Sequence, residues 1–211
     1  ALETLIELQR SYTEQASQFE ALNARLVERK RFDLRRDEVA AQITQERALM
    51  KRDLEDRQRT IDEARLLFSE YTRILYGKAG GLGVNVTSAG YNFTFTIDRE
   101  GSDGVDQMVV FCFDLTIATL RARSNTGFQT LIHDSTLFAD VDPRQYGLTL
   151  QLAASTSALE GFQYICCLNS GALPKNHLGE LELEPLTRLR LTDDGDAGRL
   201  LGIKLAPRDQ R

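Results

Sequence analysis

The sequence predicts an α/β protein in two parts, a long coiled-coil helix over residues 1–76 and a mixed α/β domain over residues 77–211. Two observations predict this division. All 15 glycines and all four prolines lie from Gly77 onward, and a heptad pattern of apolar residues fills the segment before it. Because glycine and proline interrupt helices, the first segment favours one long helix.

The heptad seam continues in a single register through residues 5–75. It is polar at Arg29, Asp33 and Arg36, which predicts a weak or bent middle. A helix with an apolar stripe needs a partner, either a second copy or another arm. A helical hairpin that turns near residues 27–38 is the rival interpretation, although that stretch lacks turn residues. The apolar positions of the seam are Leu5, Leu8, Tyr12, Phe19, Leu22, Leu26, Ile43, Met50, Leu54, Ile61, Phe68, Tyr71 and Leu75.

The second part changes from one periodicity to another several times. Alternating residues around Ser88 and Gly90 predict a β-hairpin, and a strand-helix-strand succession further on predicts a parallel pair of strands. Pro143 suits the first turn of the helix between those strands. The expected elements are strands at 82–87 and 91–98, a helix at 106–123, a strand at 128–132, a helix at 142–160, a strand at 162–168 and a terminal hairpin at 186–191 and 199–205.

Composition limits the class of protein. The net charge of -5 argues against a generally basic nucleic-acid coat, and no apolar run approaches the length of a membrane span. Three cysteines without metal-ligand spacing, and no signal pattern, suggest a cytoplasmic protein. A basic cluster on the long helix fits either a DNA backbone or a solvated charged face, and the intervening acidic residues favour the solvated face. That cluster comprises Arg29, Lys30, Arg31, Arg35 and Arg36.

Polar side chains gather where the strand at 128–132 ends, at His133, Asp134, Ser135, Asp140 and Asp142. Ligands of open α/β sheets collect at the carboxyl ends of strands. An Asp directly after an apolar strand suits Mg²⁺, because this hard cation takes oxygen ligands. The alternative is that Asp134 and Ser135 only cap the loop.

Three segments resemble an uncharacterised domain at the C-terminus of bacterial SMC-like coiled-coil ATPases. They are FDLTIATL, LIHDSTLFADVDPRQ and RLTDDGDAGRLLGIKL. The order of elements is similar to the C-terminal half of an ABC-type head of the SMC and RecN class. The resemblance implies a coiled-coil arm followed by the C-terminal lobe of a P-loop ATPase head, with ATP and Mg²⁺ as cofactors.

By the resemblance, Asp134 is the magnesium-supporting Asp of the Walker B strand. Ser135 stands where such ATPases usually carry a catalytic Glu, and a serine cannot serve as a carboxylate base. His133 is a candidate to take over part of a polar role in catalysis.

The same resemblance assigns nucleotide-binding roles to three other residues. Ser102 and Gly104 stand in for the signature loop, which holds a phosphate with backbone N–H groups at a helix N-terminus. Asp142 corresponds to the Asp of the D-loop. Asn169 and Ser170 occupy the switch loop, where the usual His is absent.

No G-x-x-x-x-G-K-[ST] motif occurs in the sequence. The resemblance places that phosphate cradle in an N-terminal lobe, so the chain is expected to be part of a longer protein and to be inactive alone. Expected partners are the N-terminal lobe, a second copy of the chain, DNA and a small protein of the same system, in DNA repair, maintenance or bacterial defence.

Two other functions fit the residues. The first is a non-enzymatic coiled-coil dimer whose globular end acts as a protein-interaction adaptor. The second is a metal-dependent phosphoesterase that uses His133, Asp134, Asp140 and Asp142.

Overall fold

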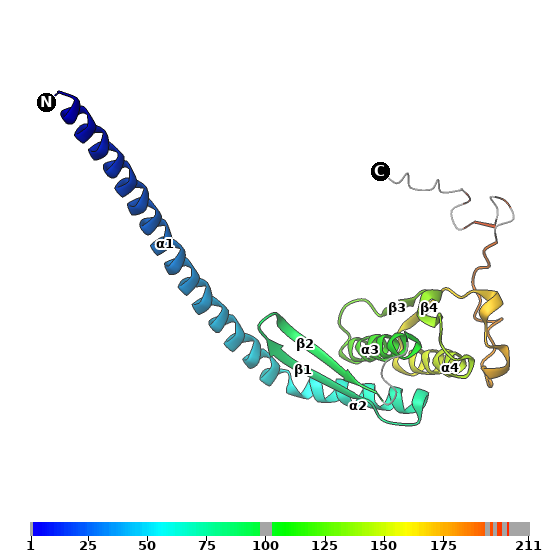
Figure 1. The fold of residues 1–211 in the computed structure, drawn as a ribbon. Coiled ribbons are helices and arrows are strands. Elements are labelled where there is room, and N and C mark those ends of the chain that lie inside the picture. Colours follow the sequence, from blue (N-terminus) through cyan, green and yellow to red (C-terminus); the bar gives the residue numbers. More distant parts are fainter. Residues whose placement is uncertain (1, 98–102, 193–194, 196–197, 200–201, 203–211) are drawn as a thin grey trace. The chain divides into compact units, whose positions relative to one another are not determined.

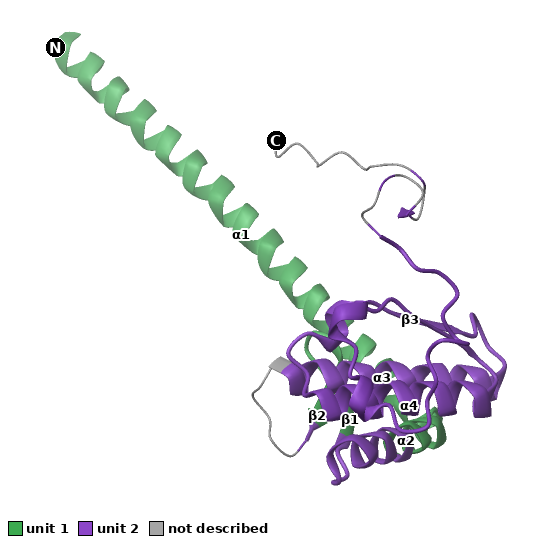
Figure 2. Cartoon of the chain, turned by 90° about the vertical axis from the view of Figure 1, so that its right-hand side faces the viewer, with its two compact units in different colours: residues 1–65, 82–95 green, residues 66–81, 96–211 purple. Residues whose placement is uncertain are grey.

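The computed structural model describes residues 2–97, 103–192, 195, 198–199 and 202. It is a mixed α/β protein with a long N-terminal helix (Figure 1). The chain forms two compact units, the first from residues 1–65 and 82–95 and the second from residues 66–81 and 96–211 (Figure 2). None of the described helices has the length and apolar character needed to cross a bilayer.

The first unit is dominated by α1 (Leu2–Asp56), a helix of 55 residues without a single buried side chain. At about 1.5 Å per residue it extends for roughly 80 Å. It runs unbroken through residues 27–38, so the rival helical hairpin is wrong. A short irregularity at Arg57 precedes α2 (Gln58–Tyr76), and the backbone bond from Ile61 N to Arg57 O, 3.0 Å long, keeps the ladder continuous there.

The predicted β-hairpin is confirmed as β1 (Gly81–Thr87) and β2 (Gly90–Thr96), which form a two-stranded sheet. A Cβ on Gly83 would collide with the hydroxyl of Thr94, so any larger residue at this crossing requires the Thr94 side chain to move. The hairpin lies against the end of α1, where the Tyr91 hydroxyl donates to Asp53 over 2.8 Å.

The second unit contains the predicted strand-helix-strand arrangement. β3 (Thr130–His133) pairs in parallel with β4 (Gln163–Cys166), and α4 (Pro143–Glu160) connects them. Both strands are shorter than the sequence predicted. Pro143 opens α4 as expected, and Gly161 closes it in the left-handed conformation, with φ 77°.

The core of the second unit forms around α3 (Asp103–Ser124). Met108, Phe111 and Leu115 have no exposed surface, and neither has Phe68 of α2. Met108, Phe111 and Leu115 follow a helical spacing of three and four residues, so they line one face of α3. Burying an aromatic or large aliphatic side chain of this kind contributes about 1.5–3 kcal/mol.

Within the described part of the second unit, short 3-10 helices follow β3 and β4. They are η1 (Ser135–Phe138), η2 (Ser170–Ala172) and η3 (Lys175–His177). η3 rests directly on α4, because Gly147 carries no side chain and a Cβ there would strike the carbonyl of His177.

The predicted strand at 186–191 is wrong. This segment begins in a turn, in which the Thr187 N–H donates to the Leu183 carbonyl over 2.9 Å, and among the described residues it pairs with no strand. Its apolar residues Leu186, Leu189 and Leu191 are all more than half exposed, so no face is buried to hold a strand. Most of the partner strand expected at 199–205 lies outside the described residues.

Two tyrosines of α2 provide a matched test of this core. The hydroxyls of Tyr71 and Thr119 form a buried hydrogen bond of 2.9 Å. The Tyr76 hydroxyl is buried and has no hydrogen-bond partner among the described residues. Burial raises the pKa of Tyr76 to about 12.

We expect Tyr71→Phe to lower the free energy of unfolding by about 1 kcal/mol, because Thr119 loses its partner. Tyr76→Phe removes an unpaired buried hydroxyl and should be neutral or stabilising. Urea unfolding followed by tyrosine fluorescence measures both. An equal loss for the two variants would contradict this description of the core.

Candidate functional site

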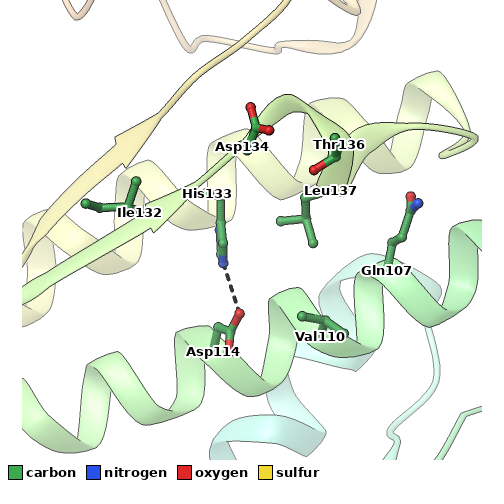
Figure 3. A pocket seen from close by; sticks show the side chains of 8 residues that line it. All are labelled: Gln107, Val110, Asp114, Ile132, His133, Asp134, Thr136 and Leu137. Carbon is green, nitrogen blue, oxygen red and sulfur yellow. Dashed lines mark hydrogen bonds and ion pairs between the residues drawn. The ribbon is translucent and has the colours of Figure 1, made fainter. Parts of the chain in front are cut away.

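A shallow hollow of about 420 Å³ lies between α3 and the carboxyl end of β3 (Figure 3). The hollow lies where the sequence predicted the candidate site, at the carboxyl end of the strand that precedes Asp134. Its walls come from α3, β3 and η1. The lining residues are Gln107, Val110, Asp114, Ile132, His133, Asp134, Thr136 and Leu137.

His133 is the buried polar residue of this hollow, with 7% of its surface exposed. Its Nε2 lies 3.2 Å from Oδ2 of Asp114, and its Nδ1 lies 3.1 Å from the Tyr164 hydroxyl. Because a carboxylate only accepts, the contact with Asp114 places a proton on Nε2, and the Tyr164 hydroxyl is the partner of Nδ1. Both nitrogens of His133 are therefore occupied, so this side chain links α3 to both strands.

The aromatic contacts of His133 reinforce this position. Its ring centroid lies 5.6 Å from that of Phe111 and 5.6 Å from that of Tyr164, which it meets edge to face. Burial, together with the nearby Cys166 thiol, raises the pKa of Tyr164 well above its usual range. Tyr164 therefore stays protonated at neutral pH, as a hydroxyl that can donate to His133.

Asp134 points the other way. In Figure 3 its carboxylate is directed away from Asp114, while His133 points toward α3. Asp134 is exposed and caps η1, with Oδ1 accepting from the Ser135 N–H over 2.7 Å. The Ser135 hydroxyl lies 3.4 Å from the same oxygen. The structure thus brings Asp134 and Ser135 together, with the carboxylate open to solvent.

Two of the candidate nucleotide-binding residues, Gly104 and Asp142, lie at the starts of helices. Gly104 is buried in the first turn of α3, so close to the Asp140 carbonyl that a Cβ would collide with it. Asp142 caps α4 by accepting from Arg144 N over 3.0 Å. The start of α3 therefore lies beside the loop before α4. Ser102 lies outside the described residues, and the nucleotide-binding roles of all three remain predictions.

Asn169, the candidate switch-loop residue, caps η2 by accepting from the Gly171 N–H over 3.0 Å. This geometry is a turn, and a catalytic role for Asn169 or Ser170 remains a prediction.

Asp134 can serve as one oxygen ligand of Mg²⁺, because its carboxylate is exposed and directly follows β3. Mg²⁺ in phosphate-handling sites is commonly held by one or two carboxylates together with the phosphates. Within the described ranges, no three His, Cys, Asp or Glu side chains cluster closely enough to bind a metal by themselves. A site built by this chain alone, as the phosphoesterase hypothesis requires, gains no geometric support.

Sequence reasoning missed Asp114 and Tyr164. Asp114 interrupts the apolar run FCFDLTIATL, and Tyr164 sits in the run FQYICCL. The available signals were the one charged residue of the first run and the tyrosine of the second. These signals could not identify His133 as the shared partner, because Asp114 and Tyr164 reach it only after β3 and β4 pair against α3.

The fold is thus a mixed α/β protein with a solvent-open carboxylate at a strand end and a long N-terminal helix. A family model described as an uncharacterised protein conserved in bacteria, DUF2326, matches residues 71–205. The match covers more than half of the chain, and the protein belongs to this family. The predicted membership of an uncharacterised bacterial domain is confirmed. No curated protein matches the sequence.

The contact between Asp114 and His133 can be tested on stability. We expect Asp114→Ala to lower the free energy of unfolding by about 1–2 kcal/mol, since the buried Nε2 of His133 loses its acceptor. Asp106→Ala is the matched control, because Asp106 is exposed on the same helix and should change stability by less than about 0.5 kcal/mol. Similar effects of the two substitutions in urea unfolding would refute the contact.

Thiol reactivity tests which cysteine side chains at the end of β4 are buried. Burial raises the pKa of Cys166 to about 11, whereas Cys167 is exposed and Cys112 is buried. Because the thiolate is the reactive form, iodoacetamide at pH 8 should modify Cys167 first and Cys166 slowly, with Cys112 protected until unfolding. The rate at Cys166 should rise with pH toward about 11. Mass spectrometry identifies the modified residues, and faster labelling of Cys166 than of Cys167 would contradict the burial of Cys166.

Proposed function

We propose that this chain is the C-terminal half of an ATPase similar to SMC and RecN, in which it supplies the magnesium-supporting carboxylate of a composite ATP site. The observation that carries the proposal is the place of Asp134, exposed at the carboxyl end of a parallel strand. Ligands of α/β sheets bind at this edge, and nucleotide hydrolases hold Mg²⁺ with such an Asp.

The β3–β4 sheet supports the need for a second half. Leu131, His133, Tyr164 and Cys166 are at least partly buried, whereas Thr130, Ile132, Gln163 and Ile165 on the alternate positions are exposed. Ile132 is 63% exposed. Parallel sheets are normally covered on both faces. In the proposal, the missing N-terminal lobe covers this face and supplies the phosphate cradle.

Each residue then has a defined task. Asp134 would hold Mg²⁺ when MgATP is bound, and the ion would neutralise charge on the transferring phosphate. Asp114 and Tyr164 fix His133 and so hold the strand end against α3. Gly104 and Asp142 belong to the two helix ends assigned to signature-loop and D-loop roles. The proposal includes a cytoplasmic protein, DNA as a substrate and a small partner protein of the same system.

The basic cluster on α1 gives limited support to DNA binding. Arg35 lies 3.2 Å from Glu38, and Arg36 lies 3.0 Å from Asp37 and 3.5 Å from Asp33. Acidic neighbours therefore offset part of the charge that phosphates would meet, which favours a solvated face.

The adaptor is a second candidate, favoured by Ser135. A hydroxyl at the place of the catalytic Glu cannot accept the proton of the attacking water as a carboxylate does. Under this hypothesis the end of β3 has only a structural role, and the exposed apolar seam of α1 is the surface that binds a partner. Leu22→Glu would then abolish the activity of the parent protein, whereas Asp134→Asn would leave it intact.

The test of the ATPase is hydrolysis by the parent protein that carries both halves. We expect Asp134→Asn to reduce the rate by at least about tenfold, because a neutral amide supports the metal poorly. Asp140→Asn is the control, since Asp140 is exposed with φ 59°, a conformation that asparagine tolerates.

Three outcomes separate the hypotheses. Loss of hydrolysis in Asp134→Asn alone supports the composite site. Loss in both variants favours the phosphoesterase arrangement, which uses Asp140 as well. Absence of ATP binding by the wild-type parent would refute the ATPase and leave the adaptor.

A further inference from the structure

The seam of α1 is an uncovered apolar stripe. Phe19 is 70% exposed, Leu22 58% and Leu26 56%, and no residue of the helix is buried. Helices of this kind owe most of their stability in water to packing of the apolar face. The stripe therefore calls for a partner that covers it.

The hairpin β1–β2 already occupies the C-terminal end of the seam within the first unit. The Met50 side chain lies 3.7 Å from where a Cβ on Gly90 would stand. The hydroxyl of Tyr91 donates to Asp53, and the Arg65 guanidinium donates to the Leu82 carbonyl over 3.2 Å. The open part of the seam is thus confined to residues 5–47.

Charged residues inside the open seam decide the orientation of a second copy. Arg29, Asp33, Arg36 and Arg47 all occupy heptad core positions. In a parallel pair aligned residue for residue, each would face its own counterpart, so four layers would oppose like charges. Like charges brought together at an interface cost several kcal/mol. A parallel in-register dimer is therefore disfavoured.

An antiparallel pair removes this conflict in one register. When Arg29 of one copy faces Asp33 of the other, the reciprocal layer faces Asp33 with Arg29, giving two opposite-charge layers at the centre. The same register places Phe19 opposite Ile43, Leu22 opposite Ala40 and Gln15 opposite Arg47, again twice each. Its one unfavourable layer sets Arg36 against Leu26. The overlap covers residues 15–47.

Neighbouring antiparallel registers are worse. A shift of one heptad in one direction places Asp33 opposite Leu22, which buries a carboxylate against an apolar side chain. A shift in the other direction pairs Asp33 with Arg36, but it sets Arg47 against Leu22 and Arg29 against Ala40. Two arginines of each copy then face apolar side chains, where the proposed register has one, and the overlap of the open seam is shorter. A polar pair in a coiled-coil core is known to specify register in this way.

We propose that α1 pairs with α1 of a second copy of this chain, antiparallel across residues 15–47, with reciprocal Arg29–Asp33 layers at its centre. The proposal depends on the first unit alone and stands independently of the nucleotide site at Asp134.

The first experiment measures self-association of the 211-residue chain by sedimentation across the micromolar range. Wild-type chain should dimerise. Asp33→Arg should raise the dimer dissociation constant at least about tenfold, because the introduced arginine faces Arg29. The double variant Arg29→Asp with Asp33→Arg restores opposite charges and should return the constant to within about threefold of wild type.

The double variant needs a control, because residues 29 and 33 are also four positions apart on one helix and the swap restores that pair within each chain. The control is a 1:1 mixture of Asp33→Arg chains with Arg29→Asp chains, in which opposite charges meet only between copies and dimerisation should return to within about threefold of wild type. A parallel dimer predicts no rescue. A chain that stays monomeric, or a double variant as weak as Asp33→Arg, would overturn the proposal.

Cysteine cross-linking tests the register in a Cys166→Ser and Cys167→Ser background, in which the remaining native Cys112 is fully buried. Chains carrying Leu22→Cys mixed with chains carrying Ala40→Cys should form a mixed disulfide on oxidation. Each variant alone should form little, because in this register the two introduced thiols are not opposite each other. Efficient self-linking of either single variant indicates a parallel pair and would overturn the proposal.

Discussion

Burial of one face of α3 is the constraint on which the second unit depends. Met108, Phe111 and Leu115 are fully buried there, and β3, a strand of only four residues, could not persist without a helix to lie on. Polar contacts then fix its end, since His133 reaches Asp114 on α3 and Tyr164 on β4. The direction of Asp134 follows from this arrangement, because the residue after an inward-facing His133 must face outward.

The sequence was a sufficient guide wherever a periodicity was long or a turn residue was diagnostic. The long helix, the hairpin around Gly90 and the helix opened by Pro143 all followed from such signals. The strand expected at 186–191 failed because alternation is meaningful only when one face is buried, and no such face exists in that segment. The strand pair was predictable in order and direction, but its ends depended on packing.

Only part of the candidate site could be predicted from the sequence. Asp134 and Ser135 were found because they follow a strand directly. Asp114 and Tyr164 were not, since residues 19 and 31 positions from His133 become neighbours only through tertiary packing. For the same reason the sequence grouped His133 with Asp134, although the alternation of the strand sends their side chains to opposite sides.

Protection of the strand end by nucleotide tests the central claim, a composite ATP site built on Asp134, most directly. Hydrogen–deuterium exchange of the parent protein would compare residues 130–142 with and without MgATP. The account predicts slower exchange across β3 and η1, and no such change in an Asp134→Asn parent. Unchanged exchange in the wild type at saturating MgATP would contradict it.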